Sequence, residues 1–365
     1  MAGAIRESGH LSFDQCLYVA SIRVLESKAR WGGQAVPEET FVSFVVIAYN
    51  EAANIARTLA AITELEDLGE HEVIVVDDGS RDRTAQIVSE LGEQNSCVRL
   101  IALGENRGRG YARSRGIAAA RGGLIAMVDA DIILPANWLA RMRAALADHD
   151  AVGGIAVPDG DVAYVCKRFR LVPRVVSGTT TITGNNGLYR CKVFDVASFD
   201  PGLREGEDIA LNYAMVRQGL SFVTVPGLLV QHEENKTLGT SLRWLFDTGR
   251  GATRQLLTYH EVRQPDLVTG AFVGAAALGL FLAARERRLI GATIPVGFVL
   301  AASVQHVSSR FETPRSHWSR VAPAVAVDSA MLTAYFAGRL VGLTALLRRT
   351  DSALSAGPAT CGLPH

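Results

Sequence analysis

The feature that most constrains the fold is a regular alternation of strand-length apolar runs with segments of helical periodicity, which begins at Phe41. Four such runs occupy residues 41–48, 73–78, 98–103 and 124–128, and segments with apolar residues at helical spacing separate them. Continuous apolar strands that alternate with helices indicate a parallel α/β sheet. Because ligands bind such sheets beyond the carboxyl ends of the strands, we expect the functional site at that edge.

Polar residues stand where these predicted strands end. Asn50 follows the first strand, Asp77 and Asp78 end the second, and Asp129 ends the fourth. Two carboxylates at Asp129 and Asp131, just beyond a strand, can reach one Mg²⁺ or Mn²⁺ ion, which takes its other oxygen ligands from substrate phosphates. Most isolated Asp-x-Asp motifs are solvated turns, so the position after the fourth strand is what favours a metal site.

The neighbouring loops offer groups suited to a nucleotide. Asp77 and Asp78 can accept from a base imide or a ribose hydroxyl, Tyr49 offers a ring face to a base, and Asn50 and Ser80 are placed to cap the following helices. Ordinary strand-to-helix turns would show the same residues. The loop after the third strand lacks the glycine spacing of a dinucleotide fingerprint, and its arginines either meet the nucleotide or line a solvated helix face.

Several blocks in order resemble family 2 glycosyltransferases, and the resemblance covers roughly residues 41–235. The blocks are Tyr49-Asn50-Glu51, Asp77-Asp78-Gly79-Ser80, Asn106 through Arg113, Asp129-Ala130-Asp131, Gly184-Asn185-Asn186 and Glu207-Asp208. The resemblance implies an inverting GT-A enzyme, with a Rossmann-like, mostly parallel sheet, that binds a nucleotide-sugar donor and a divalent metal. A UDP-sugar is favoured by its frequency in the family.

The resemblance also assigns residues to roles. It assigns nucleotide binding to Ala48, Tyr49, Asn50, Glu51, Asp77, Asp78, Ser80, Asn106, Gly108, Arg113 and Asp129. It assigns Mg²⁺ or Mn²⁺ binding to Asp131, Asp129 and His232, and donor-sugar or acceptor contacts to Asn185, Asn186, Arg243 and Trp244.

Asp208 is implied as the general base for the acceptor hydroxyl, with Glu207 beside it. A helix N-terminus favours the carboxylate form of Asp208, whereas the charge of Glu207 opposes it. Both acids would also suit simple helix capping, and His232 suits a capping or solvated role as well as a metal. Thr240 replaces the glutamine of the Gln-x-x-Arg-Trp signature of processive synthases, so Arg243 and Trp244 do not by themselves indicate polymer synthesis; Trp244 also suits an interfacial anchor.

Three apolar stretches follow the α/β region. Residues 267–284 contain no charge over 18 residues, residues 289–304 are apolar or small, and residues 321–347 are interrupted only by Asp328 and Arg339. A helix of 18 residues is about 27 Å long, close to a bilayer core. The stretches therefore predict three transmembrane helices or one span with a shallow hairpin, against the alternative of a buried helical bundle. Asp328 and Arg339 share a helix face, and ionisable groups within a span indicate function by default.

Composition narrows the function further. Basic and acidic residues balance at 37 each, which does not favour a nucleic-acid partner. The five cysteines stand singly, so we expect reduced thiols rather than zinc or disulfides. The first residues lack a basic stretch followed by an apolar one, so they do not form a secretory signal. We expect a multi-pass protein of the cell inner membrane with a cytoplasmic catalytic domain.

The predicted organisation has five parts. They are an N-terminal extension (1–40), a GT-A domain (41–245), an interfacial linker (246–266), membrane segments (267–349) and a tail (350–365). The predicted reaction moves a sugar from a nucleotide-diphosphate sugar to a glycan or polyprenyl-lipid acceptor, as in making envelope polysaccharide. A sugar nucleotidyltransferase is the enzyme alternative, but Tyr49-Asn50-Glu51 stands where such enzymes place a glycine-rich basic loop. A non-catalytic membrane scaffold of the same fold would not need Asp131 and Asp208.

Overall fold

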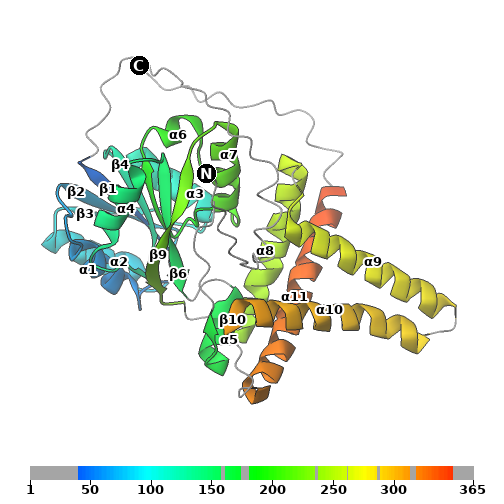
Figure 1. The fold of residues 1–365 in the computed structure, drawn as a ribbon. Helices are drawn as coiled ribbons and strands as arrows, with labels where there is room; N and C mark the ends of the chain where they lie inside the picture. The colour runs from blue at the N-terminus through cyan, green and yellow to red at the C-terminus, as the bar shows by residue number, and fades with distance from the viewer. Residues whose placement is uncertain are drawn as a thin grey trace, which may run out of the picture. The chain divides into compact units, whose positions relative to one another are not determined.

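The computed structural model describes residues 40–157, 161–173, 181–234, 237–260, 262–285, 288–312 and 318–347 (Figure 1). The chain forms two compact units, which we call the sheet unit (Met1–Thr237 and Val304–Val325) and the helical unit (Leu238–Ser303 and Ala326–His365). Residues 1–39 of the predicted extension and the tail at 350–365 lie outside the described residues.

The sheet unit contains an eight-stranded sheet in the order β3-β2-β1-β4-β8-β6-β9-β5. The four strands predicted from hydropathy are present as β1 (Val42–Ala48), β2 (His71–Asp77), β3 (Val98–Ala102) and β4 (Leu124–Asp129). They pair in parallel, with β1 between β2 and β4. The carboxyl ends of these strands therefore lie along one edge, as the sequence predicts.

The other half of the sheet is mixed. Strand β8 (Asn186–Arg190) is antiparallel between β4 and β6 (Ala151–Val157), and β5 (Ile132–Ile133) is antiparallel to β9 (Phe222–His232), which pairs in parallel with β6. Strand β9 runs unbroken through Pro226 and Gly227, although these residue types are typical of turns. Gly227, at φ 65°, lies within β9 and accompanies a register shift against β6, so the bend is absorbed without ending the strand.

Helices cover both faces of this sheet. On one face α1 (Ile55–Thr63), α2 (Thr84–Gln94) and α4 (Trp138–Leu146) pack on inward side chains such as Phe44 and Val46. On the other face α3 (Arg109–Ala119), α6 (Val193–Val196) and α7 (Glu207–Arg217) pack on Val45 and Ile47. Both sets of strand side chains are buried, which explains why the strands are apolar throughout.

A short pair of strands brings the chain back to the sheet unit after the helix α10 (Arg288–Arg310). After α5 (Asp161–Phe169), the short strand β7 (Val172–Pro173) pairs antiparallel with β10 (Phe311–Glu312). Residues 304–325, which connect the last two long helices, therefore belong to the sheet unit.

The helical unit is built from α8 (Leu238–Tyr259), α9 (Gln264–Ala284), and parts of α10 (Arg288–Arg310) and α11 (Trp318–Leu347). Within the part of the chain that the structure describes, three segments are long and apolar enough to cross a membrane: Gln264–Ala284, Leu289–Arg310 and Ser319–Thr344. Helices α9 and α10 form a hairpin (Figure 1), with the backbones of Gly279 and Gly291 in close contact.

Helix α11 packs against the hairpin through one buried ion pair and an aromatic cluster. Arg339 donates to the Asp266 carboxylate and, at 3.3 Å, to the Thr269 hydroxyl. The rings of Phe272 and Phe336 stack at 4.4 Å. Arg339 is conspicuous in the sequence because it interrupts the apolar stretch 321–347. Asp266 is not, because it stands just before the apolar stretch 267–284.

The glycine contact in the hairpin yields a stability prediction. A Cβ on Gly279 would lie 2.5 Å from the Gly291 carbonyl oxygen, whereas one on Gly274 of the same helix meets nothing within 4 Å. Gly279→Leu should therefore separate the helices and destabilise the detergent-solubilised protein by about 1–3 kcal/mol. Gly274→Leu is the matched control, and thermal unfolding of the two variants measures the difference. Equal melting temperatures would contradict the hairpin.

Candidate active site

The loops after β1 and β2 are tied together by polar side chains. The Asn50 amide donates to the Ser80 hydroxyl at 2.8 Å, and the Arg81 amide donates to the Asn50 side chain at 2.8 Å. Asn50 and Ser80 do not cap helices as predicted, because α1 begins only at Ile55 and α2 at Thr84. Instead they join two loops, and Asn50 accepts a φ of 59° to do so. Beside them, the Tyr49 side chain is exposed.

The two acids at the end of β2 have different surroundings. Both Asp78 oxygens accept backbone amides, from Arg107 at 2.7 Å and Gly108 at 2.9 Å, so this side chain holds the loop after β3. Burial still raises the pKa of Asp78. One Asp77 oxygen accepts the Ser80 amide, and the other is buried without a hydrogen-bond partner. Asp77 is therefore the acid that retains an acceptor for a ligand.

The loop after β3 is held from a second side. The Arg204 guanidinium donates to the Asn106 carbonyl oxygen at 3.1 Å and to its side-chain oxygen. Gly108 has a φ of 97°, and a Cβ there would lie 2.9 Å from Arg204. Asn106 and Gly108, predicted to meet the nucleotide, thus shape the loop, and Ala48 contributes a backbone carbonyl that accepts the Asp78 amide.

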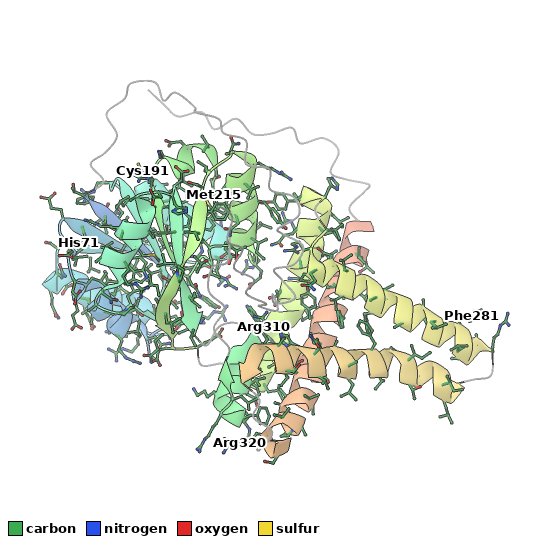
Figure 2. The ribbon with its side chains drawn as sticks, in the orientation of Figure 1. His71, Cys191, Met215, Phe281, Arg310 and Arg320 are labelled. Carbon is green, nitrogen blue, oxygen red and sulfur yellow. The ribbon has the colours of Figure 1, made fainter. Side chains whose placement is uncertain are left out.

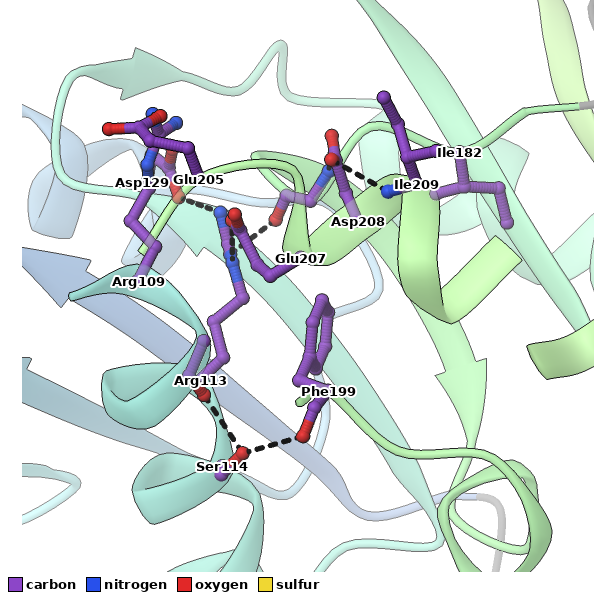
Figure 3. A network of polar contacts seen from close by, with 12 residues as sticks. Arg109, Arg113, Ser114, Asp129, Ile182, Phe199, Glu205, Glu207, Asp208 and Ile209 are labelled. Atoms are coloured by element: carbon purple, nitrogen blue, oxygen red, sulfur yellow. Dashed lines mark hydrogen bonds and ion pairs between the residues drawn. The ribbon is translucent and has the colours of Figure 1, made fainter. Parts of the chain in front are cut away.

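Arg113 is the centre of a buried polar network (Figure 3). Its guanidinium donates to Asp129 at 2.8 Å, to Glu207 at 3.1 Å and to the Gly184 carbonyl oxygen at 2.5 Å. The side chain is 1% exposed. It joins α3, β4, the segment before β8 and α7, so it positions these elements rather than projecting into solvent.

Glu207 and Asp208, predicted as the catalytic acids, differ in their contacts. Glu207 is buried in the ion pair with Arg113. The Asp208 carboxylate accepts hydrogen bonds from the Ile209 amide at 2.7 Å and from the Gly184 amide at 3.4 Å. Figure 3 shows the first of these. Burial, with the adjacent Glu207 charge, raises the pKa of Asp208 to about 6. The Asp208 carboxylate is therefore ionised at neutral pH yet more basic than an ordinary aspartate.

Asp131 and His232 meet at the end of β4. Their side chains approach to 3.1 Å, and β5 pairs with β9 in a register that places Ile132 opposite His232. Burial and the nearby Asp131 charge raise the pKa of Glu51 to about 7. The carboxyl groups of Asp131 and Glu51 therefore create a negative potential at this place, which would stabilise a bound cation.

This donor set fits a divalent ion that is shared with a substrate. Among the residues described, no group of three or more His, Cys, Asp or Glu side chains is arranged to hold a metal by itself. A carboxylate and an imidazole nevertheless suit Mn²⁺ or Mg²⁺ when diphosphate oxygens and waters supply the remaining ligands. The predicted ligand Asp129 gives one oxygen to Arg113, and burial raises its pKa.

The residues predicted to contact the sugar or the acceptor differ in their burial and their hydrogen bonds. The Asn186 side chain is fully buried and accepts from the Trp138 ring at 2.7 Å, so it packs in the core. The Asn185 side-chain oxygen is buried without a hydrogen-bond partner, and its backbone oxygen accepts the Asp129 amide. Arg243 and Trp244 lie on α8 of the helical unit and stay a prediction.

Comparison with known proteins agrees with this arrangement. Residues 43–196 match the model of glycosyl transferase family 2. This part of the chain is a family 2 glycosyltransferase domain. The mannosyltransferase of Pyrobaculum calidifontis, solved with GDP-Man and Mn²⁺, superimposes with a TM-score of 0.52 over 89% of this chain and 92% of its own, at 19% identity. That likeness supports the GT-A fold alone.

Two curated relatives share part of the domain. Succinoglycan biosynthesis protein ExoO of Rhizobium meliloti is 43% identical over 129 residues, 35% of each chain. The undecaprenyl-phosphate 4-deoxy-4-formamido-L-arabinose transferase of Pseudomonas aeruginosa is 35% identical over 147 residues, 39% of this chain and 43% of its own. The match with each relative therefore spans less than half of that relative's length.

Some residues of the site were missed by sequence reasoning. Arg109 pairs with Glu205 beside the Arg113 network, and a Cβ on Gly184 would lie 2.9 Å from the Arg113 guanidinium. Arg109 and Arg113 are four residues apart on α3 and so share one face, which is a signal in the sequence. Gly184 stands in one of the blocks that carry the family resemblance, whereas Glu205 has no comparable local signal.

The buried network predicts a difference between two arginines. Arg113→Gln leaves Asp129 and Glu207 buried without their cation, so it should lower the free energy of unfolding by about 3–5 kcal/mol. Arg107 is 48% exposed beside an exposed Glu105, so Arg107→Gln should cost about 0–1 kcal/mol. Chemical denaturation of both variants tests this, and equal losses would contradict the central role of Arg113.

Proposed function

We propose that this protein transfers a sugar from a nucleotide-diphosphate sugar to a hydroxyl or phosphate of a membrane-bound acceptor, with inversion at the anomeric carbon. The observation that carries the proposal is the environment of Asp208. It is a carboxylate at a helix start, with a raised pKa and a position fixed by the Arg113 network. A base for a hydroxyl needs this combination of ionisation and basicity near neutral pH.

The chain's own residues divide the work as follows. Asp77, with its unused buried oxygen, accepts from the nucleoside, and the exposed Tyr49 ring lies beside the same loops. When the acceptor is a hydroxyl, Asp208 takes its proton as the acceptor oxygen bonds to the anomeric carbon and the bond from that carbon to the nucleoside diphosphate breaks; a phosphate acceptor attacks as an oxyanion already ionised. Glu207 and Arg113 keep Asp208 and Asp129 in place. Because the attacking and departing oxygens lie on opposite sides of the carbon, the configuration inverts.

Asp131 and His232 would hold a divalent ion at the donor diphosphate. When bound, such an ion neutralises the charge that develops on the departing nucleoside diphosphate. Glu51 lies close enough to Asp131 for their charges to interact, and adds to the negative field that attracts the ion.

The acceptor class rests on two observations. Three helices among the described residues are long and apolar enough to cross a membrane, and the name of one relative includes undecaprenyl phosphate. We therefore propose a polyprenyl-phosphate or lipid-linked glycan acceptor at the inner membrane, with the sheet unit in the cytoplasm. UDP-sugars are the first donors to test.

A donor panel tests the proposal. The purified protein is incubated with nucleotide sugars, Mn²⁺ or Mg²⁺, and a polyprenyl phosphate, and release of nucleoside diphosphate is measured. One donor should be consumed, and with a lipid-linked glycan in place of the polyprenyl phosphate, so that a hydroxyl is the nucleophile, Asp208→Asn should lower the rate by at least about 100-fold, within the range for loss of a general base. Asp148→Asn, an exposed aspartate elsewhere in the sheet unit, is the matched control. The absence of both turnover and nucleotide binding under every condition would favour a scaffold, whereas binding without turnover would point to an acceptor missing from the panel.

The pKa of Asp208 predicts a pH profile. The active form of a base is deprotonated, so the proposed activity should fall as the pH drops through about 6 and level off above it. Measurement of kcat/KM from pH 5 to pH 8 is the check. A profile without a break near pH 6 in the wild-type protein would argue against Asp208 as the base.

Metal binding can be measured apart from activity. Titration of Mn²⁺ with nucleoside diphosphate present, followed by electron paramagnetic resonance, should show at least about tenfold weaker binding for Asp131→Asn and His232→Gln. Asp148→Asn again serves as the control. Unchanged affinity in both site variants would remove them from the proposed metal site.

A further inference from the structure

The contacts within the helical unit conflict with three successive membrane crossings. If α9, α10 and α11 each crossed in turn, the start of α9 and the end of α11 would lie at opposite membrane faces. Asp266 is the third residue of α9, and Arg339 stands near the end of the Ser319–Thr344 segment. The two side chains form a buried ion pair, so these residues lie at the same depth.

The helix lengths make the conflict quantitative. From Trp318 to Arg339 the rise along α11 is about 31 Å at 1.5 Å per residue, which equals the thickness of the hydrocarbon core. A crossing α11 would therefore carry Arg339 to the far face while Asp266 stayed at the near one. The stacking of Phe272 on Phe336 and the hydrogen bond of Ser329 to Ser303 (3.0 Å) extend the contact along α11 at this one level.

Away from α11, the surface of the hairpin is apolar and exposed, unlike its buried contacts with α11. Beyond its contacts with α11, its large apolar side chains are exposed: Leu278, Leu280, Phe281, Leu289, Ile290 and Val296. Figure 2 shows Phe281 near the far end of α9. At 21 residues, α9 is about 31 Å long, enough for one crossing. The residues that follow α10 belong to the sheet unit, so the chain returns to the side from which it left.

We propose that α9 and α10 cross the bilayer as a hairpin and that α11 does not cross but lies across the base of the hairpin at the near membrane face. The residues before α9 and the C-terminus are then on one side, and Arg285 at the hairpin tip is on the other. The buried Asp266–Arg339 pair pins α11 to the hairpin. This inference does not depend on the proposed catalysis.

The arginine distribution agrees with this topology. The tip carries Arg285, Arg287 and Arg288, whereas the near side gains Arg348 and Arg349 after α11 in addition to Arg310, Arg315 and Arg320. Three crossings would instead place Arg348 and Arg349 with the tip, which would reverse the asymmetry. Arginine excess on the cytoplasmic side is the usual arrangement. The near side, with the sheet unit, is therefore the cytoplasmic one.

Single-cysteine labelling tests the topology. In a background without the other cysteines, three variants carry one thiol each: the native Cys361, Ser96→Cys on the exposed surface of the sheet unit, or Arg285→Cys. Sealed spheroplasts are treated with a membrane-impermeant maleimide before and after lysis, and labelling is normalised to the denatured protein. Arg285→Cys should label fully before lysis, and the other two should lose nearly all labelling until lysis.

Either of two results would overturn the proposal. Labelling of Cys361 from the side opposite to Ser96→Cys would show that α11 crosses. Labelling of Arg285→Cys from the same side as Ser96→Cys, or only in detergent, would show that the hairpin does not. Protease digestion of an epitope appended after His365, in the otherwise native chain, provides a second reading if cysteine replacement impairs folding: protection in sealed spheroplasts supports the proposal, and digestion contradicts it.

Discussion

The proposed site depends on one buried cation. Arg113 takes a charge into the core of the sheet unit and satisfies it with two carboxylates and a carbonyl oxygen from three other parts of the chain. Removing water from these groups is costly, so the arrangement is stable only if all partners are present. In return Asp129 and Glu207 are held in fixed positions, while burial and the adjacent Glu207 charge raise the pKa of Asp208. The geometry of the proposed site thus depends on how one arginine is buried.

Much of the sheet unit could be predicted from the sequence, because both faces of its central strands are buried and the strands are therefore continuously apolar. The four strands β1 to β4 and the polar residues at their ends follow directly. Side-chain partnerships could not be predicted. Asp78 and Asn106 look like ligand-binding residues in the sequence, and in the structure Asp78 also accepts amides of the loop after β3, while Asn106 also accepts hydrogen bonds from Arg204. Asn186 is polar but packs against Trp138 in the core. Such roles depend on contacts between residues far apart in the chain.

The apolar helices show a similar limit. Length and composition identify three candidate spans, but they carry no information about which helix ends meet. The ion pair of Asp266 with Arg339 supplies that information, since it fixes two residues at one depth. A two-helix hairpin whose base is covered by a helix that stays at the near membrane face suits the proposed transfer from a soluble nucleotide sugar to a membrane-bound acceptor.

The stereochemistry of the product tests the central claim most directly. If Asp208 activates the acceptor for direct displacement, an α-linked donor gives a β-linked product. The anomeric proton coupling of the isolated product, measured by NMR with the donor identified in the panel, distinguishes the two anomers for a gluco-configured sugar. A β-linked product is the predicted result. An α-linked product would contradict the single displacement, and with it the role assigned to Asp208.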